Sequence, residues 1–207
     1  MSIDYSKARR LLARRDPILR DLMRRHGPCG PADSQHTDPF QALVRAIISQ
    51  QLSTKAAATI AARVDGLLEG LPTPARAAAV SDAQLRSAGL SGQKVSYLRN
   101  LCAQIADGSL PLDTLDGMPD DEVIEALTRV KGIGRWTAEM FLMFRLHRPD
   151  VLPVGDLGIV KAVQRAYRLR TPPSPARLLR LSESWRPYRS VACWYLWASL
   201  GNVPAQE

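Results

Sequence analysis

Apolar residues recur along most of the chain with the three- and four-residue spacing of α-helices. One such series lies between residues 11 and 22, and another covers residues 123–130. Sustained alternation of apolar and polar residues, which is typical of strands, is hard to find. Ser81 and Gln84 have the spacing of a capping box that opens a helix, and Gly89 is a typical stop at its end. The pattern predicts an all-α protein of about ten short helices.

A stretch with two prolines and a glycine divides the chain softly. This stretch, "SLPLDTLDGMP" at 109–119, separates a central helical lobe at about 30–115 from a later lobe at about 116–207. A helix predicted over residues 5–26 could pack on either lobe. The lobes are expected to form one folded unit over residues 1–207, because the chain is long enough to bury a core.

The charge is strongly positive and unevenly distributed. The sequence has 28 lysine and arginine residues against 20 aspartate and glutamate residues, a net charge of +8. Basic residues crowd the first 25 positions and recur between residues 161 and 190. A polyanionic partner such as nucleic acid is the natural expectation, although charge alone also fits a solvated basic surface.

The cysteines and the apolar runs exclude several classes of protein. Cys29, Cys102 and Cys193 are far apart and form no CxxC pair, so neither a disulfide framework nor a zinc or iron–sulfur site is supported. No stretch reaches the roughly 20 apolar residues of a membrane span. We therefore expect a cytoplasmic protein without a membrane partner.

Residues 121–145 have the pattern of two helices joined by the hairpin "KGIG". Gly132 and Gly134 allow the backbone to take positive φ and to approach another molecule closely. The helix that follows offers free N–H groups at its start, which suit a phosphate of a nucleic-acid backbone. A GxG pattern by itself is weak, and a helix end followed by an ordinary turn is the alternative.

Further motifs give the hairpin a context. In "RPDVLPVGDLG", Pro153 precedes Asp156, which stands at the start of another amphipathic helix. Three more stretches belong with these motifs: "LVRAIISQQLSTKAAATIAARV", "GLSGQKVSYLRNLC" and "WRPYRSVACWYLW". Over roughly residues 5–203 the chain resembles the helix-hairpin-helix DNA glycosylase superfamily, and within it the alkylbase group of the 3-methyladenine DNA glycosylase II type. The resemblance implies a two-lobed helical fold with the active-site cleft between the lobes.

The resemblance also implies a reaction and a base pocket. Asp156 would be the catalytic carboxylate that stabilises positive charge on the sugar while the N-glycosidic bond of an alkylated purine breaks. An N-cap is the alternative role for this aspartate, and the two roles are compatible. Trp136 and Trp197, with Met140 one turn after Trp136, would wall the base pocket, because aromatic faces attract a cationic base. Core packing is the alternative for all three.

The expected partner is double-stranded DNA with the damaged base flipped out, bound by a monomer. By resemblance, Gln51 with its neighbour Leu52 matches the position that fills the gap left in the duplex by the flipped nucleotide; a polar pair at a helix end is the alternative. The other expected DNA contacts are Gly132, Gly134, Arg135, Thr137 and Lys94; for Arg135 and Lys94 a solvated surface position is the alternative. By resemblance, the carbonyls of Thr128, Val130 and Ile133 would bind a structural Na⁺ or K⁺. No other cofactor is expected.

Position 136 predicts the subtype of the reaction. Related branches that cleave the DNA strand carry a lysine nucleophile after the hairpin, whereas this chain has Trp136. A monofunctional hydrolase of base excision repair without lyase activity is therefore expected. Two alternatives stay open: a glycosylase of the same fold for deaminated or etheno bases, and a noncatalytic DNA-binding module. The preferred base is not encoded in these motifs.

Overall fold

The computed structural model describes residues 3–29 and 38–201, and in this part of the chain all regular structure is helical. The all-α prediction is confirmed. The chain divides into two compact units, unit 1 (Met1–Ser34 and Leu142–Glu207) and unit 2 (Gln35–Phe141). Within the described ranges, no helix is both long enough and apolar enough to cross a membrane.

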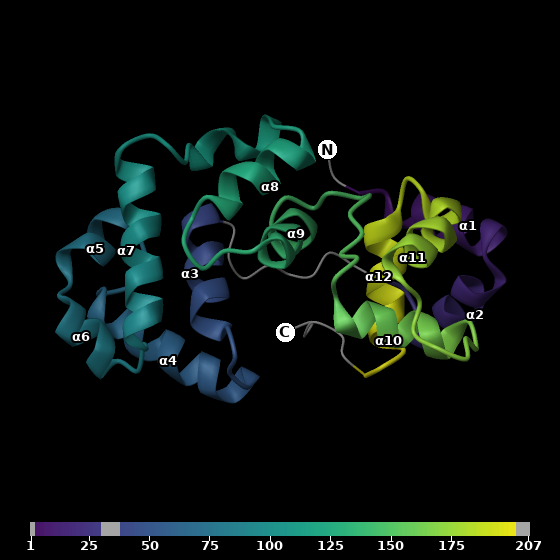
Figure 1. The fold of residues 1–207 in the computed structure, drawn as a ribbon, viewed down its shortest axis with the longest axis horizontal. Helices are drawn as coiled ribbons and strands as arrows, with labels where there is room; N and C mark the ends of the chain where they lie inside the picture. The colour runs from purple at the N-terminus through teal and green to yellow at the C-terminus, as the bar shows by residue number, and fades with distance from the viewer. Residues whose placement is uncertain (1–2, 30–37, 202–207) are drawn as a thin grey trace. The chain divides into compact units, whose positions relative to one another are not determined.

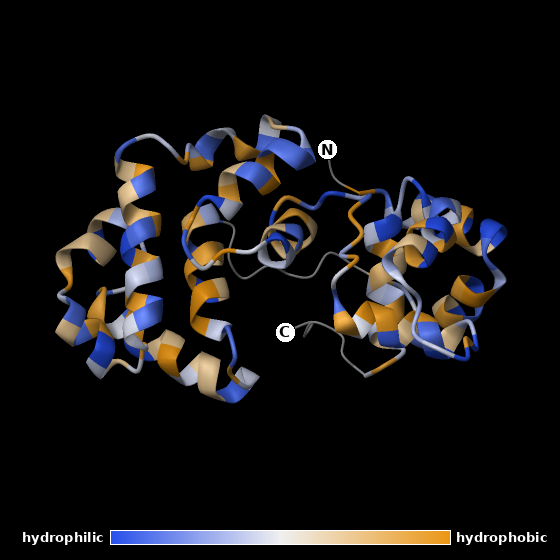
Figure 2. Cartoon of the chain, in the orientation of Figure 1, coloured by the Kyte–Doolittle hydropathy of each residue, from blue (hydrophilic) through white to orange (hydrophobic). Residues whose placement is uncertain are grey.

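Unit 2 is built around helix α7. Its elements are α3 (Pro39–Ser49), α4 (Thr54–Leu67), α5 (Pro74–Ala79), α6 (Asp82–Ser87), α7 (Gly92–Ala106), the 3₁₀ helix η1 (Leu112–Gly117) and α8 (Asp120–Thr128) (Figure 1). Helix α7 packs against α3 and α5 and buries Val95, Leu98 and Leu101. The predicted capping box of Ser81 and Gln84 opens α6. Figure 2 shows the hydrophobic residues of α3, which belong to this core.

Unit 1 surrounds the C-terminal helix. Its elements are α1 (Tyr5–Arg15), α2 (Pro17–His26), α10 (Leu157–Ala166), α11 (Pro175–Ser182), the 3₁₀ helix η2 (Glu183–Trp185) and α12 (Arg189–Ala198). Helix α12 packs against α1, α2 and α10 and is buried from Ser190 to Ala198. A helix that is apolar nearly all round is expected at the centre of a core. Helix α9 (Arg135–Phe144) begins in unit 2 and ends in unit 1.

The N-terminal segment differs from the prediction. Instead of one helix over residues 5–26, α1 and α2 are separated by Asp16, whose backbone is extended with φ −138° and ψ 109°. Pro17 is the physical reason, because proline disfavours the helical conformation of the residue before it. The side chain of Asp16 then caps α2 by accepting the backbone N–H groups of Ile18 and Leu19.

The division of the chain also differs from the boundary expected near residues 109–119. The hairpin and α8 belong to the unit of the central helices, and the N-terminal helices belong to the unit of α12. Side chains of α7 explain the first difference: Asn100 accepts the N–H of Lys131, and Gln104 donates to the carbonyl of Arg129. The expected start of the central lobe, near residue 30, lies outside the described residues.

The buried carboxylate of Asp16 connects three parts of unit 1. Besides capping α2 through Oδ1, it accepts at Oδ2 the hydroxyl of Tyr167 and the indole N–H of Trp185, the latter at 3.0 Å. Burial, and then the hydrogen bond to this carboxylate, raise the pKa of Tyr167, so the phenol stays a donor. The start of α2, the C-cap residue of α10 and η2 thus all bond to one side chain.

Asp16→Ala is expected to lower the free energy of unfolding by about 3 kcal/mol, because two buried donors and a helix start lose their acceptor. Urea unfolding at pH 7 measures the loss. Asp21→Asn is the matched control: Asp21 pairs only with the exposed Arg24 in the contacts described, and its replacement should cost less than about 0.5 kcal/mol. A loss below about 1 kcal/mol for Asp16→Ala would contradict the role given to this carboxylate.

Candidate catalytic and nucleic-acid-binding residues

Asp156 lies at the N-terminus of α10, as the sequence predicts, and its side chain is buried. Oδ1 accepts the backbone N–H of Ile159 at 2.7 Å, so the residue is the N-cap of the helix. The N-terminal end of a helix dipole attracts negative charge. The cap and an electrostatic role in chemistry are therefore compatible in one side chain.

Trp197 of α12 is a direct neighbour of this carboxylate. Its indole N–H donates to Oδ1 of Asp156 at 3.0 Å, and its ring lies 5.9 Å from that of Phe144 between centroids. The indole is 7% exposed. Sequence reasoning selected Trp197 for stacking on a base and missed its hydrogen bond, because nothing in the local pattern reveals which side chain an indole meets.

Leu157 directly follows Asp156 and is the first residue of α10. This leucine is 83% exposed, the largest exposure among the exposed large apolar residues of the described chain. Solvated leucines are individually common. Its position gives the first turn of α10 an exposed apolar residue next to Asp156 in the sequence.

The hairpin glycines of unit 2 differ in what they do. Gly132 has φ +85°, and a Cβ there would lie 2.2 Å from the ring of Tyr97. Glycine is thus required at this position for two reasons, its backbone conformation and its packing against Tyr97. Gly134 does not take positive φ, contrary to the prediction, and its surroundings are open, with no atom within 4 Å of an added Cβ. It leaves room for a close approach at the start of α9.

The hairpin is fixed to the turn between α3 and α4. Gln50 donates from Nε2 to the carbonyl of Gly132 at 2.8 Å. The next two residues, Gln51 and Leu52, are the expected gap-filling pair, and both are exposed, with Gln51 at φ +58° and Leu52 at 39% exposure. Sequence reasoning selected Gln51 and missed Gln50, although the doubled glutamine was a visible signal.

Lys94 has a structural task in this turn. Its ammonium group donates to the carbonyls of Ile48 at 2.7 Å and Gln50 at 2.8 Å, which lie at the C-terminal end of α3. Burial lowers the pKa of this lysine. The ammonium group thus satisfies carbonyls that the helix leaves open, and the phosphate contact of Lys94 stays a prediction.

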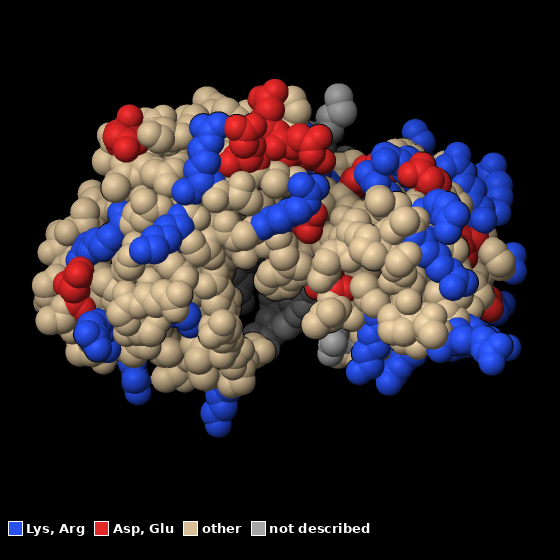
Figure 3. Space-filling view, in the orientation of Figure 1, with Lys and Arg blue, Asp and Glu red and all other residues tan. Residues whose placement is uncertain are grey.

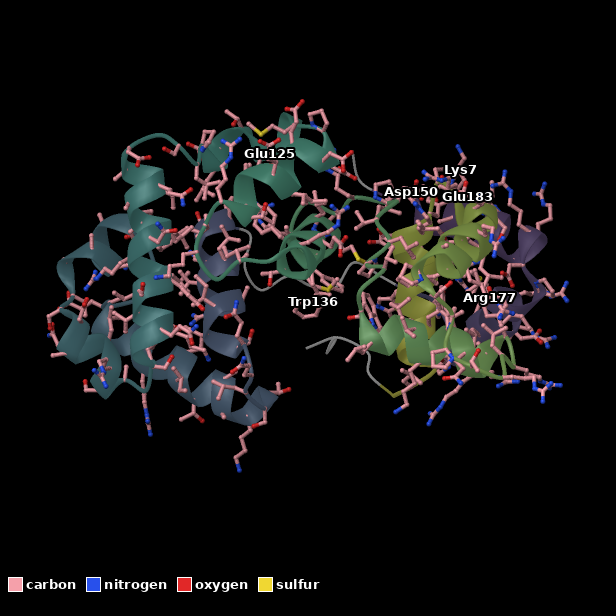
Figure 4. All side chains as sticks on the ribbon, viewed as in Figure 1. Lys7, Glu125, Trp136, Asp150, Arg177 and Glu183 are labelled. Carbon is pink, nitrogen blue, oxygen red and sulfur yellow. The ribbon has the colours of Figure 1, made fainter. Side chains whose placement is uncertain are left out.

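Helix α9 carries the remaining predicted residues. Trp136, labelled in Figure 4, is 50% exposed, and Met140, one turn later, is half-buried. Arg135 is exposed but pairs with the buried Glu139 at 3.0 Å, and Thr137 is 9% exposed. A half-exposed tryptophan is uncommon on a helix of a folded unit, where most of its apolar surface would normally be covered.

The three carbonyls expected to hold a cation lie between the end of α8 and the hairpin. Val130 and Ile133 have buried side chains, and the carbonyl of Val130 accepts the N–H of Ile133 at 3.0 Å. A carbonyl oxygen has a second lone pair, so this bond is compatible with an ion. Thr128 lies at the end of α8, and its hydroxyl donates back to the carbonyl of Ile124. Among the described residues, no group of three or more His, Cys, Asp or Glu residues could hold a metal.

The positive charge of the chain resides in one unit. Unit 1 contains 18 lysine and arginine residues against 8 aspartate and glutamate residues, whereas unit 2 contains 10 against 12. Figure 3 shows acidic side chains over α8, where Asp120, Asp121 and Glu122 form the first turn. In unit 1 some arginines are engaged: Arg186 pairs with both Asp150 and Glu183, which lie close together in Figure 4.

The sequence matches a known protein family and several characterised relatives. Residues 44–187 match the model of a family described as "HhH-GPD superfamily base excision DNA repair protein". The DNA-3-methyladenine glycosylase 1 of Schizosaccharomyces pombe is 37% identical over 163 residues, which are 77% of this chain and 72% of the relative.

Solved structures are similar over nearly the whole chain. A 3-methyladenine DNA glycosylase of Schizosaccharomyces pombe, solved in complex with abasic DNA, has a TM-score of 0.84 and 33% identity, with 97% of this chain and 100% of that chain covered. A DNA-3-methyladenine glycosidase of Bacillus halodurans has a TM-score of 0.85 and 37% identity, with 100% and 96% covered.

The two hairpin glycines should respond differently to a methyl group. Gly132→Ala should lower the free energy of unfolding by more than about 2 kcal/mol, because it adds backbone strain to a clash with Tyr97. Gly134→Ala should cost less than about 1 kcal/mol, since its Cβ meets open space. Urea unfolding of both variants tests the contrast, and equal losses would contradict it.

Proposed function

Because this chain belongs to the HhH-GPD superfamily of base excision DNA repair proteins, we propose that it is a monofunctional DNA glycosylase that removes N3- or N7-alkylated purines from double-stranded DNA. The observation that carries the proposal is the carboxylate of Asp156, buried at the head of α10 with Oδ1 held by two N–H donors. The relatives named for 3-methyladenine support the substrate class.

The chemistry follows from the charge that develops at the sugar. As the bond between C1′ and the base nitrogen breaks, its electron pair leaves with the base and positive charge builds on the sugar. An anion fixed near C1′ stabilises that charge, and one that is already oriented need not reorganise during the reaction. Water then adds to C1′ and loses a proton, for which Asp156 is the candidate acceptor. The products are an abasic site and the free base.

The alkylated base suits aromatic contacts. A purine methylated on a ring nitrogen carries positive charge, and an aromatic face attracts a cation by about 0.5–2 kcal/mol. We assign this contact to Trp136, whose half-exposed indole has surface to offer. Met140, one turn away on the same helix, would add a polarisable apolar contact.

The hairpin unit would hold the DNA. Open space at Gly134 and the N–H groups at the start of α9 suit a backbone phosphate, with Arg135 and Thr137 as adjoining contacts. Gln51 and the exposed Leu52 would occupy the gap that the flipped nucleotide leaves. The carbonyls of Thr128, Val130 and Ile133 would bind the proposed monovalent cation, which would supply positive charge to the same phosphate.

Asp156→Asn should reduce base excision by about 100-fold or more, because it removes the charge while keeping an acceptor for the cap. Single-turnover release of methylated purines, measured by chromatography of the free bases, gives the rate. Affinity for DNA containing an abasic analogue should stay within about threefold. Asp113→Asn, at an exposed carboxylate of η1, is the control and should excise normally. Normal excision by Asp156→Asn would leave only a noncatalytic DNA-binding role for this site.

The protein is expected to release the base without cutting the strand until alkali or heat is applied. Strand cleavage by β-elimination starts from a Schiff base, which needs an amine at C1′, and the indole of Trp136 supplies none. Borohydride should therefore trap no covalent adduct with the DNA. Lys131, the first residue of the hairpin, is the control: an adduct that disappears in Lys131→Ala would identify it as a nucleophile and overturn the monofunctional assignment.

A further inference from the structure

The polar edge of the Trp197 indole contacts the carboxylate of Asp156. The Nε1–H group donates to Oδ1 at 3.0 Å, and the same oxygen accepts the backbone N–H of Ile159 at 2.7 Å. Two donors from different helices, α10 and α12, that end on one oxygen restrict the rotation of the carboxylate. A ring that served only to stack on a base would not need this bond.

Gly158 makes the approach of the indole possible. A Cβ at this position would lie 2.9 Å from Oδ1 of Asp156 and 3.2 Å from both Cδ1 and Nε1 of Trp197. Any side chain would therefore have to displace the donor, the acceptor or both. The glycine does not take positive φ, so backbone conformation is not the reason for its presence.

Helix stability gives no reason for this glycine either. Gly158 lies in the first turn of α10, and glycine is among the least favourable residues in a helix. A residue that disfavours the helix in which it lies indicates that something other than helix stability requires it there. The contact between the indole and the carboxylate is the requirement visible here.

We propose that Trp197 and Gly158 are positioning residues for Asp156: Trp197 orients the carboxylate through its indole N–H, and Gly158 leaves the space in which that bond forms. This role deepens the proposed function and rests on Asp156 being the carboxylate that stabilises the sugar cation. It differs from the stacking role expected for Trp197, because it acts on the sugar and needs no base.

Two abasic duplexes separate positioning from stacking. One carries tetrahydrofuran, a neutral sugar analogue, and the other carries a protonated pyrrolidine, which imitates the charge of the transition state. Neither has a base, so a stacking wall contributes to neither. The ratio of their dissociation constants, neutral over cationic, reports how well the carboxylate is placed.

Trp197→Phe keeps an aromatic ring and removes the N–H group. We expect it to lower the ratio by about tenfold, the effect of one hydrogen bond to a charged group, while affinity for the neutral duplex stays within about twofold. Gly158→Ala should lower the ratio similarly. The double variant should lose no more than Trp197→Phe alone, because both changes break the same bond.

Gly155→Ala is the matched control, since it adds the same methyl group next to Asp156 where no atom lies within 4 Å. Its ratio should equal that of the wild type, and urea unfolding should find all variants folded. If Gly158→Ala does not fold, Trp197→Phe alone decides the role of the indole, and the failure itself contradicts the purely local role given to Gly158.

An unchanged ratio in Trp197→Phe would overturn the positioning role, even if excision of a methylated base fell. Failure of the proposed function gives a different result. In that case the wild-type protein itself would not prefer the cationic duplex, and Asp156→Asn would change nothing. If the wild type prefers the cationic duplex, Asp156→Asn abolishes the preference and Trp197→Phe retains it, then only the positioning role fails.

Discussion

The carboxylate of Asp16 accepts hydrogen bonds from three separate parts of unit 1: the first turn of α2, Tyr167 after α10, and Trp185 of η2. These segments are far apart in sequence, and this one side chain bonds to all three. A buried carboxylate is stable only when its oxygens are satisfied, so the same bonds that pay for its desolvation also fix the surrounding elements. The helix that carries Asp156 is among the elements held in this way.

The same pairing of side chains occurs twice in unit 1. Asp16 with Trp185 and Asp156 with Trp197 are both helix-capping aspartates that accept an indole N–H at 3.0 Å. An indole suits this use because its large apolar body packs in the core while its single donor points in a fixed direction. Asp16 is arranged for stability, with both oxygens engaged by core elements. At Asp156, donors from α10 and α12 meet on Oδ1, and the positioning role proposed above depends on these two bonds.

Local signals made much of the fold predictable. The capping box at Ser81, the hairpin between α8 and α9, and the helix start at Asp156 each depend on a few adjacent residues whose conformational preferences are strong. The break between α1 and α2 at Asp16 has an equally local cause, the following Pro17. By contrast, the ring of Tyr97 against Gly132 and the bond from Gln50 to the hairpin depend on how helices pack, which spacing along the chain does not encode.

The bond between Gln50 and the carbonyl of Gly132 has a consequence for how damage is found. An enzyme that searches long stretches of intact duplex must test many base pairs and release each one quickly. Because the turn of Gln51 and Leu52 is tied to the hairpin through Gln50, the proposed gap-filling residues and the proposed phosphate site would meet the DNA as one unit, with little chain entropy to lose. In the proposed role, this turn would open a weakened base pair more readily than an intact one, because a weakened pair costs less to unstack.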